Sequence, residues 1–242
     1  MRKFLIVVMF ILTPAVGFSS GESVHLDEVY INLRDKASLQ RGATLFSNYC
    51  LSCHSAAYSR YNRVGRDLGI GDDNIKKNLM FAGENVGDLM QSTMPAKDAQ
   101  KWFGVTPPDL SLIARSRNPD WLYTYMKSFY IDENSPSGWN NTVFEHVAMP
   151  HVLFELQGNQ RAIYETHGDE KAFSHFEIDE GTGQQSPEEY DLTVTDLVNF
   201  LVYLGEPAIL KRYKIGVFVL LFLLILLIPC YLMKKEFWRD VH

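Results

Sequence analysis

The sequence has few cysteines and no excess of positive charge, and both shortages exclude classes of protein. Only three of its 242 residues are cysteine, and one of them, Cys230, lies inside an apolar run. A structural zinc site needs four ligands at matching spacing, so its second pair is missing here. Lysine and arginine number 23 against 29 aspartates and glutamates, a net charge of −6. A surface that binds nucleic acid is therefore not expected.

The other two cysteines form the motif Cys50-Leu51-Ser52-Cys53-His54. This C-x-x-C-H spacing is typical of covalent c-type haem attachment, in which both thiols form thioethers and the histidine ligates the iron. A thioredoxin-like dithiol is the alternative, but it would need a preceding strand and a βαβ pattern. We therefore predict one covalently bound haem c, held by Cys50 and Cys53, with His54 as an axial ligand.

The N-terminus has the layout of a secretory signal peptide. A basic start, Met1-Arg2-Lys3, precedes an apolar stretch that is followed by small residues. A retained membrane helix is disfavoured because the stretch is too short to cross a bilayer. We predict a signal peptide over residues 1–20, with cleavage between about residues 17 and 21. Export agrees with the haem motif, because bacteria attach c-type haem outside the cytoplasm.

The C-terminal region contains a run long enough to span a membrane. Residues 215–233 carry no charge over 19 positions, which corresponds to about 30 Å of helix. We predict a single transmembrane anchor with basic flanks over residues 211–235. If the signal peptide exports the domain over residues 21–210 to the periplasm, the tail over residues 236–242 lies in the cytoplasm.

The predicted periplasmic domain is acidic although the two ends of the chain are basic. Residues 21–210 contain 27 acidic and 15 basic side chains, a net charge of −12. The densest part, residues 165–196, holds ten acidic residues and one lysine. A field of this sign attracts cationic partners. The alternative is that these carboxylates only keep the domain soluble.

Two segments far apart in the sequence are predicted to form crossing helices. The first covers residues 38–49 and contains Gly42, which is costly in a helix unless another backbone approaches closely. The second covers residues 193–204, and Thr193 with Asp196 resembles a capping box at its start. We expect these two helices to cross, with the haem packed against both.

The middle of the chain offers groups that suit a haem. Residues 56–100 are predicted to form short helices around it, and residues 106–110 a rigid proline turn. The carbonyl of Pro108 can accept the Nδ1 proton of a ligating histidine. Arg115 and Arg117 follow, and either guanidinium can pair with a haem propionate or simply face solvent.

A helix start is predicted at Asn118-Pro119-Asp120. Asparagine is a preferred N-cap, proline suits the first helical position and aspartate the first turn. The apolar face of this helix consists of Trp121, Leu122, Tyr125, Met126 and Phe129.

The order of these motifs resembles the cytochrome c1 family in its bacterial form. The segments that carry the resemblance are LQRGATLFSNYCLSCHS, PPDLSLIARSR, NPDWLYTYMKSFY, SGWNNTVFEHVAMPHVLFELQG and DLVNFLVYLGEP. It implies a mainly α, class I c-type cytochrome fold with enlarged loops and one C-terminal transmembrane helix. It also implies that Pro108 bonds to His54, that Arg117 meets a propionate, and that Met149 is the distal ligand.

Met94 is the rival for the distal ligand, because it also precedes a proline. In this fold the chain passes the proline turn on the histidine side before it reaches the sulfur side. Met149 follows Pro108 in the sequence and Met94 precedes it, so we favour Met149. Ligation by His146 or His151 is the less favoured alternative.

The resemblance implies an electron carrier that is not an enzyme on its own. It would work in a quinol–cytochrome c oxidoreductase with cytochrome b, taking electrons from a Rieske iron–sulfur protein and passing them to a soluble basic cytochrome c. Two alternatives remain: a membrane-anchored, peroxidase-like haem enzyme with an open distal site, and a stand-alone membrane cytochrome.

Overall fold

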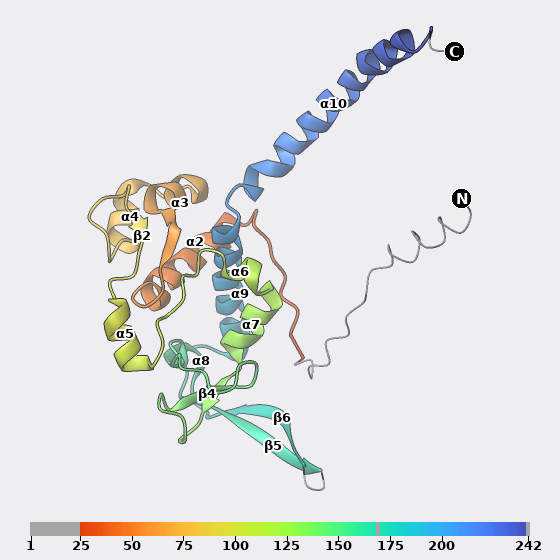
Figure 1. The fold of residues 1–242 in the computed structure, drawn as a ribbon. Coiled ribbons are helices and arrows are strands. Elements are labelled where there is room, and N and C mark those ends of the chain that lie inside the picture. The colour runs from red at the N-terminus through yellow and green to blue at the C-terminus, as the bar shows by residue number, and fades with distance from the viewer. Residues whose placement is uncertain (1–24, 168–169, 241–242) are drawn as a thin grey trace.

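The protein is mainly helical, and one long helix projects from its main domain (Figure 1). The computed structural model describes residues 25–167 and 170–240. The helices are α2 (Lys36–Leu45), η1 (Phe46–Cys50), α3 (Tyr61–Leu68), α4 (Asp72–Asn78), α5 (Ala96–Phe103), α6 (Ile113–Ser116), α7 (Pro119–Lys127), α8 (Phe154–Gln157), α9 (Pro187–Gly205) and α10 (Ile209–Phe237). The predicted mainly α fold with one apolar C-terminal helix is confirmed.

The strands within the described residues form three separate two-stranded antiparallel sheets. They are β1 (Ala56–Arg60) with β2 (Leu89–Met90), β3 (Phe129–Ile131) with β4 (Trp139–Asn141), and β5 (Gln160–His167) with β6 (Glu170–Ile178). In the β3–β4 pair, Phe129 lies opposite Asn141. This register brings the end of β4 beside the end of α7.

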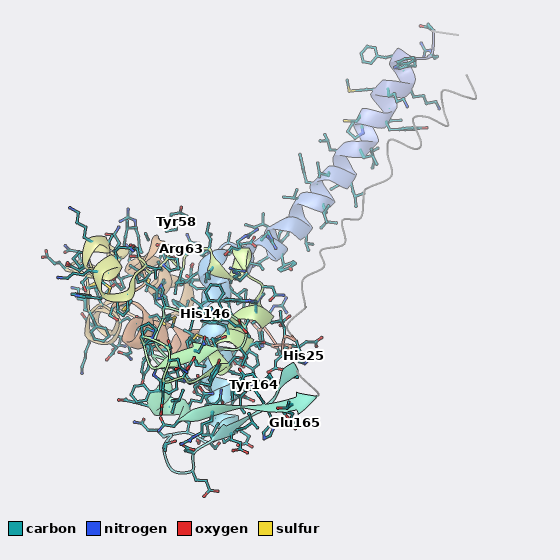
Figure 2. The ribbon with its side chains drawn as sticks, turned by 60° about the horizontal axis from the view of Figure 1, so that its bottom comes forward. His25, Tyr58, Arg63, His146, Tyr164 and Glu165 are labelled. Carbon is teal, nitrogen blue, oxygen red and sulfur yellow. The ribbon has the colours of Figure 1, made fainter. Side chains whose placement is uncertain are left out.

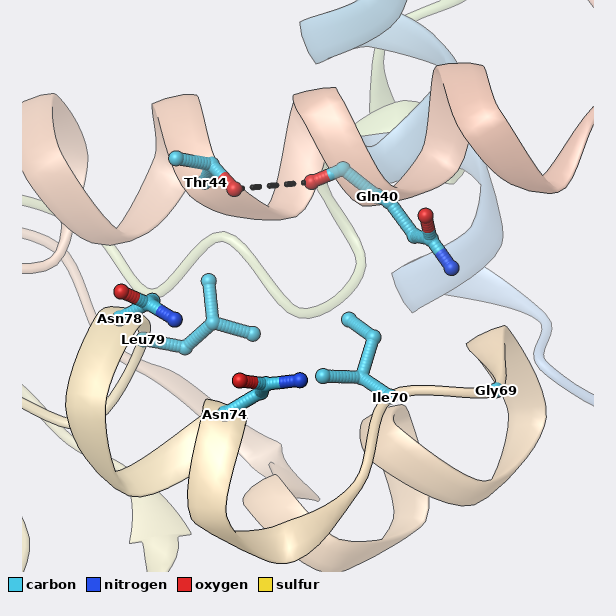
Figure 3. Close-up of a pocket in the computed structure, with 7 residues that line it drawn as sticks. All are labelled: Gln40, Thr44, Gly69, Ile70, Asn74, Asn78 and Leu79. Atoms are coloured by element: carbon cyan, nitrogen blue, oxygen red, sulfur yellow. Dashed lines mark hydrogen bonds between the residues drawn. The ribbon is translucent and has the colours of Figure 1, made fainter.

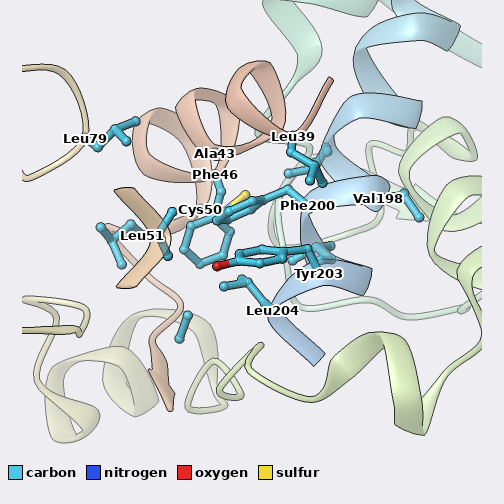
Figure 4. Packing of buried hydrophobic residues seen from close by; sticks show 14 of the residues in the cluster. Leu39, Ala43, Phe46, Cys50, Leu51, Leu79, Val198, Phe200, Tyr203 and Leu204 are labelled. Atoms are coloured by element: carbon cyan, nitrogen blue, oxygen red, sulfur yellow. The ribbon is translucent and has the colours of Figure 1, made fainter. Parts of the chain in front are cut away.

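The core is built where α2 crosses α9, as the glycine predicted. A Cβ at Gly42 would overlap the carbonyl oxygen of Asp196 and lie 2.7 Å from the Cβ of Phe200. Arg41 forms an ion pair with Asp196 at the same crossing, with Nη2 and Oδ1 2.8 Å apart. The rings of Phe46 and Phe200 pack at 5.6 Å within the buried cluster (Figure 4). The crossing therefore fixes the end of α2, which leads directly to the cysteine motif.

The first helix differs from its predicted bounds. It begins at Lys36 because the carboxylate of Asp35 accepts a hydrogen bond from the Ser38 amide at 3.1 Å. Its last turn widens into the π-helix η1, which ends at Cys50. Single π-helical turns of this kind are frequent at functional sites.

The predicted start of α9 is wrong. The helix begins at Pro187, and Ser186 with Glu189 forms a reciprocal capping box ahead of it. Thr193 and Asp196, which were expected to form the cap, lie inside the helix. The earlier capping signal therefore extends the helix by almost two turns.

Replacing Ser186 with alanine is expected to destabilise the protein by about 1 kcal/mol, because it removes an N-cap hydrogen bond. Replacing Thr193 with alanine serves as the control and should change stability by less than about 0.5 kcal/mol. Thermal unfolding of the two variants side by side measures the difference. Equal effects would contradict this helix boundary.

The densest acidic segment, residues 165–196, is divided between a hairpin and a helix. It runs through the hairpin β5–β6, which projects from the domain and carries Tyr164 and Glu165 (Figure 2), and into α9. Among the described residues of this segment, Asp179 forms an ion pair with Arg161, Asp191 with Lys127, and Asp196 with Arg41, and Glu177 lies 3.4 Å from His175. These pairs lower the net charge that the segment presents to solvent.

Helix α10 has the length and composition of a membrane span. It covers Ile209–Phe237, slightly more than the predicted anchor, and none of its residues is buried (Figure 2). Pro229 lies inside the helix, where surrounding groups can re-satisfy the backbone. The predicted signal peptide lies outside the described residues.

Candidate functional site

The cysteine motif folds into a tight turn directly after η1. The amides of Cys53 and His54 both donate to the carbonyl oxygen of Cys50, at 3.1 and 2.7 Å. Both cysteines are free thiols, with Cys50 buried and Cys53 partly exposed. Burial raises the pKa of the Cys50 thiol to about 12. The turn therefore holds two thiols and the histidine next to each other.

His54 is 9% exposed and has a fixed ring orientation. Its Nδ1 lies 2.8 Å from the carbonyl oxygen of Pro108. Because that oxygen can only accept, Nδ1 carries the proton and Nε2 keeps its lone pair. Burial lowers the pKa of His54, and the hydrogen bond to Pro108 opposes this shift. The ring is thus a neutral imidazole whose Nε2 has a free lone pair, and this is the form that ligates metals.

Further hydrogen bonds join the proline turn to the chain after His54. The Leu110 amide donates to the Ser55 carbonyl at 2.8 Å, and the Ala57 amide donates to the Asp109 carboxylate at 2.9 Å. The structure therefore brings two of the predicted site residues, His54 and Pro108, together across more than fifty positions of sequence.

Met94 lies beside the cysteine motif. Its amide donates to Ser92 Oγ at 3.1 Å, and the same hydroxyl donates to the carbonyl of Ser52 at 2.6 Å. The Ser92 amide also donates to Ser55 Oγ at 2.9 Å. The loop that carries Met94 is therefore fastened to the same turn that carries His54.

Met149 lies instead beside α7. The Tyr125 hydroxyl donates to its Sδ at 3.5 Å, and burial raises the pKa of that hydroxyl, so it stays a donor. Tyr125 stacks on Trp121 with ring centroids 4.9 Å apart, and the edge of Phe129 packs 5.0 Å away. Asn118 caps this helix as predicted, accepting from the Trp121 amide at 2.6 Å. The packed rings of Trp121 and Phe129 therefore hold Tyr125 so that its hydroxyl lies at the sulfur of Met149.

The two arginines of the site have different surroundings. Arg115 donates to Glu206 at 3.0 Å, so part of its charge is already neutralised. The Arg117 guanidinium lies 4.8 Å over the ring of Trp121. Within the described part of the chain it pairs with no carboxylate, which leaves Arg117 the better candidate for an anionic group.

Two pockets lie near α2. One of about 340 Å³ opens between α2 and α4 and is lined mainly by amides and short side chains (Figure 3). It contains none of the predicted site residues. The other, of about 300 Å³, opens beside the cysteine motif and includes Leu51 and Ser52 in its lining.

The donor set suits a covalently attached haem. Two free thiols can form thioethers, and the fixed imidazole has a free Nε2 for the iron. In the sequence, Tyr125 is part of an apolar packing face and nothing marks Asn141, but in the structure the Asn141 amide donates to the carbonyl of Tyr125 at 2.8 Å. The sequence feature that points to Tyr125 is its spacing of four residues from Trp121, which places the two aromatic rings on one face of α7.

The chain is similar to a family of known proteins, to individual proteins and to a solved structure. The model of the family described as "Cytochrome C1 family" matches residues 27–241. A "Cytochrome c1" from Allochromatium vinosum is 51% identical over 100% of both chains. An "Ammonia monooxygenase gamma subunit" from Nitrosomonas europaea is 49% identical over 100% of this chain and 99% of its own. A solved chain described as "Hyperthermophilic respiratory Complex III" covers 100% of this chain and 96% of its own at 15% identity, with a TM-score of 0.40, too low to support an argument.

Proposed function

The chain belongs to the cytochrome c1 family, and on this premise we propose that it carries electrons from a Rieske iron–sulfur protein to a soluble cytochrome c. Membership makes it a c-type cytochrome of the cytochrome bc1 complex, an electron-transfer subunit and not an enzyme by itself. The observation that carries the proposal is the hydrogen bond from His54 to Pro108 beside two free thiols.

The proposed haem site uses residues from three parts of the chain: the cysteine motif, the segment with Arg115 and Arg117, and Met149. Cys50 and Cys53 attach one haem c covalently, His54 ligates the iron through Nε2, and Met149 ligates it through Sδ. The position of Met94 supports this choice, because hydrogen bonds through Ser92 hold its loop on the turn that carries His54, whereas Met149 would approach the haem from a different segment, next to α7. Arg117 pairs with a propionate, whereas Arg115 contributes less because it already binds Glu206.

The chain's own residues would set the redox properties of this site. When bound, the haem supplies an iron that alternates between the ferric and ferrous states and so carries one electron. The Pro108 carbonyl orients the His54 ring and increases its basicity. A thioether ligand favours the ferrous state and raises the reduction potential relative to two histidines. With His54 and Met149 both holding the iron, no position on it would be left for a substrate.

The proposed partners follow from the family and the charge distribution. Cytochrome b and the Rieske protein are the neighbours in the complex, and α10 contacts membrane lipid. The net charge of −12 over residues 21–210 supports a basic cytochrome c as the acceptor, since opposite charge accelerates association. We place the haem domain in the periplasm, with a single span through the inner membrane and a cytoplasmic C-terminus.

Purification of the complex from membranes tests this function. We expect this chain to travel with a cytochrome b and a Rieske protein, and its ferrous haem to bind carbon monoxide poorly. Rapid carbon monoxide binding would favour the peroxidase-like alternative, and isolation without partners would favour a stand-alone cytochrome. Co-purification with oxygenase subunits would instead favour the role named for the Nitrosomonas europaea relative.

A further inference from the structure

The loop that leads to Met149 is held at the end of α7 by the buried side-chain amide of Asn141, next to a backbone hydrogen bond from the Thr142 amide to the Ser128 carbonyl at 3.3 Å. Its Nδ2 donates to the carbonyl of Tyr125 at 2.8 Å, and its Oδ1 accepts from the amides of Val143 and Phe144 at 2.9 and 3.1 Å. The residue is 0% exposed. Losing the bond to Tyr125 would leave the buried Nδ2 of Asn141 without this acceptor, which is costly. The side chain therefore fixes the start of the loop on the last turn of α7.

Asn140 closes the same loop further along. Its Oδ1 accepts from the His146 amide at 2.9 Å, and its Nδ2 donates to Asp132 at 3.0 Å. His146, labelled in Figure 2, has a φ of 57°, a left-handed conformation that is uncommon outside glycine. Such a conformation persists only where surrounding structure holds it. The path from Asn141 to Met149 is thus fixed at two points.

Tyr125 is the residue that the start and the end of this loop share. Its backbone carbonyl accepts from Asn141, and its hydroxyl donates to Met149 Sδ at 3.5 Å. A thioether sulfur has two lone pairs, so one can accept a hydrogen bond from the hydroxyl while the other binds a metal. The loop and the helix therefore form a closed arrangement around the sulfur.

We propose that Asn141 is a positioning residue for Met149: it holds residues 141–149 on α7 so that the sulfur stays at the iron. The proposal rests on the proposed function, in which Met149 is the distal ligand. Without the bond to Tyr125, the loop gains conformational freedom, and ordering it again opposes sulfur binding. The sulfur then spends a larger fraction of time off the iron.

The test uses Asn141→Ser and Asn141→Asp in the full chain, purified in its membrane complex. Both side chains can still accept from the loop amides, but neither can donate to the Tyr125 carbonyl from the position of Nδ2. We expect a weaker methionine–ferric haem band and a carbon monoxide binding rate raised about tenfold, which corresponds to about 1.4 kcal/mol. The reduction potential should fall as well.

Asn199→Ala is the matched control. Asn199 is also a buried amide, bonded to Ser38 Oγ at 2.8 Å and accepting from the Asn32 amide at 3.0 Å, but it lies on α9. It should lower thermal stability without changing the methionine band or carbon monoxide binding. Asn141 variants that behave like this control would overturn the proposal. Met149→Leu, measured in parallel, separates this outcome from failure of the proposed function: if that variant keeps the band, the ligand assignment itself is wrong.

Discussion

Replacing Met149 with leucine is expected to remove the distal ligand and leave the haem iron with one axial position open. The weak absorption band of methionine-bound ferric haem should disappear, and carbon monoxide should bind the ferrous form readily. Axial ligands set haem potentials over a range of about 0.8 V, so the potential should fall by roughly 100 mV or more. Visible spectroscopy and a redox titration of the purified complex measure both effects.

Met94→Leu is the matched control, because it makes the same change in the other Met-Pro dipeptide. The Met94 amide bonds to Ser92, whose hydroxyl in turn bonds to Ser52 in the cysteine turn. We expect this variant to keep the methionine band and the potential of the unmodified protein. If the two variants exchange these results, Met94 is the ligand and Met149 is a packing residue.

The features that sequence predicted correctly are those whose signals are local. The side-chain oxygen of Asn118 accepts from the amide of Trp121, only three residues away, and the apolar run in α10 is continuous. Gly42 differs from these, because the local sequence shows only that a glycine destabilises a helix. That cost nevertheless indicated a close helix crossing, and the structure contains it. A residue that is unfavourable locally indicates a contact elsewhere in the fold.

The features that sequence missed depend on pairing between distant segments. Asp196 looked like part of a helix cap because its partner, Arg41, lies 155 positions away. Tyr125 and Asn141 each have an ordinary packing or loop role in the sequence, and only the register of β3 with β4 brings Asn141 to the carbonyl of Tyr125. Hydrogen bonds of this kind have no periodic signal, so a structure is needed to find them.

Replacing Gly42 with alanine is expected to cost about 2 kcal/mol of stability. The new methyl group would overlap the Asp196 carbonyl oxygen and crowd the Phe200 Cβ, and both belong to the rigid core of α9. Overpacking in a core usually costs about 1–3 kcal/mol, and here the obstacle is backbone, which cannot change rotamer. The gain of about 1 kcal/mol in helix propensity offsets only part of this. Thermal unfolding of the complex, followed by haem absorbance, measures the loss.

Gly87→Ala is the control for this change, because nothing lies within 4 Å of a Cβ at that position. Its stability should stay within about 0.5 kcal/mol of the unmodified protein.

The two variants should also differ in haem content, since α2 continues through η1 into Cys50. Separating α2 from α9 moves the attachment turn away from the helix that packs beside it, so less haem should be bound per chain in Gly42→Ala. A normal haem content together with unchanged stability would mean that the two helices can move apart without cost, and the close crossing would not be what positions the cysteines.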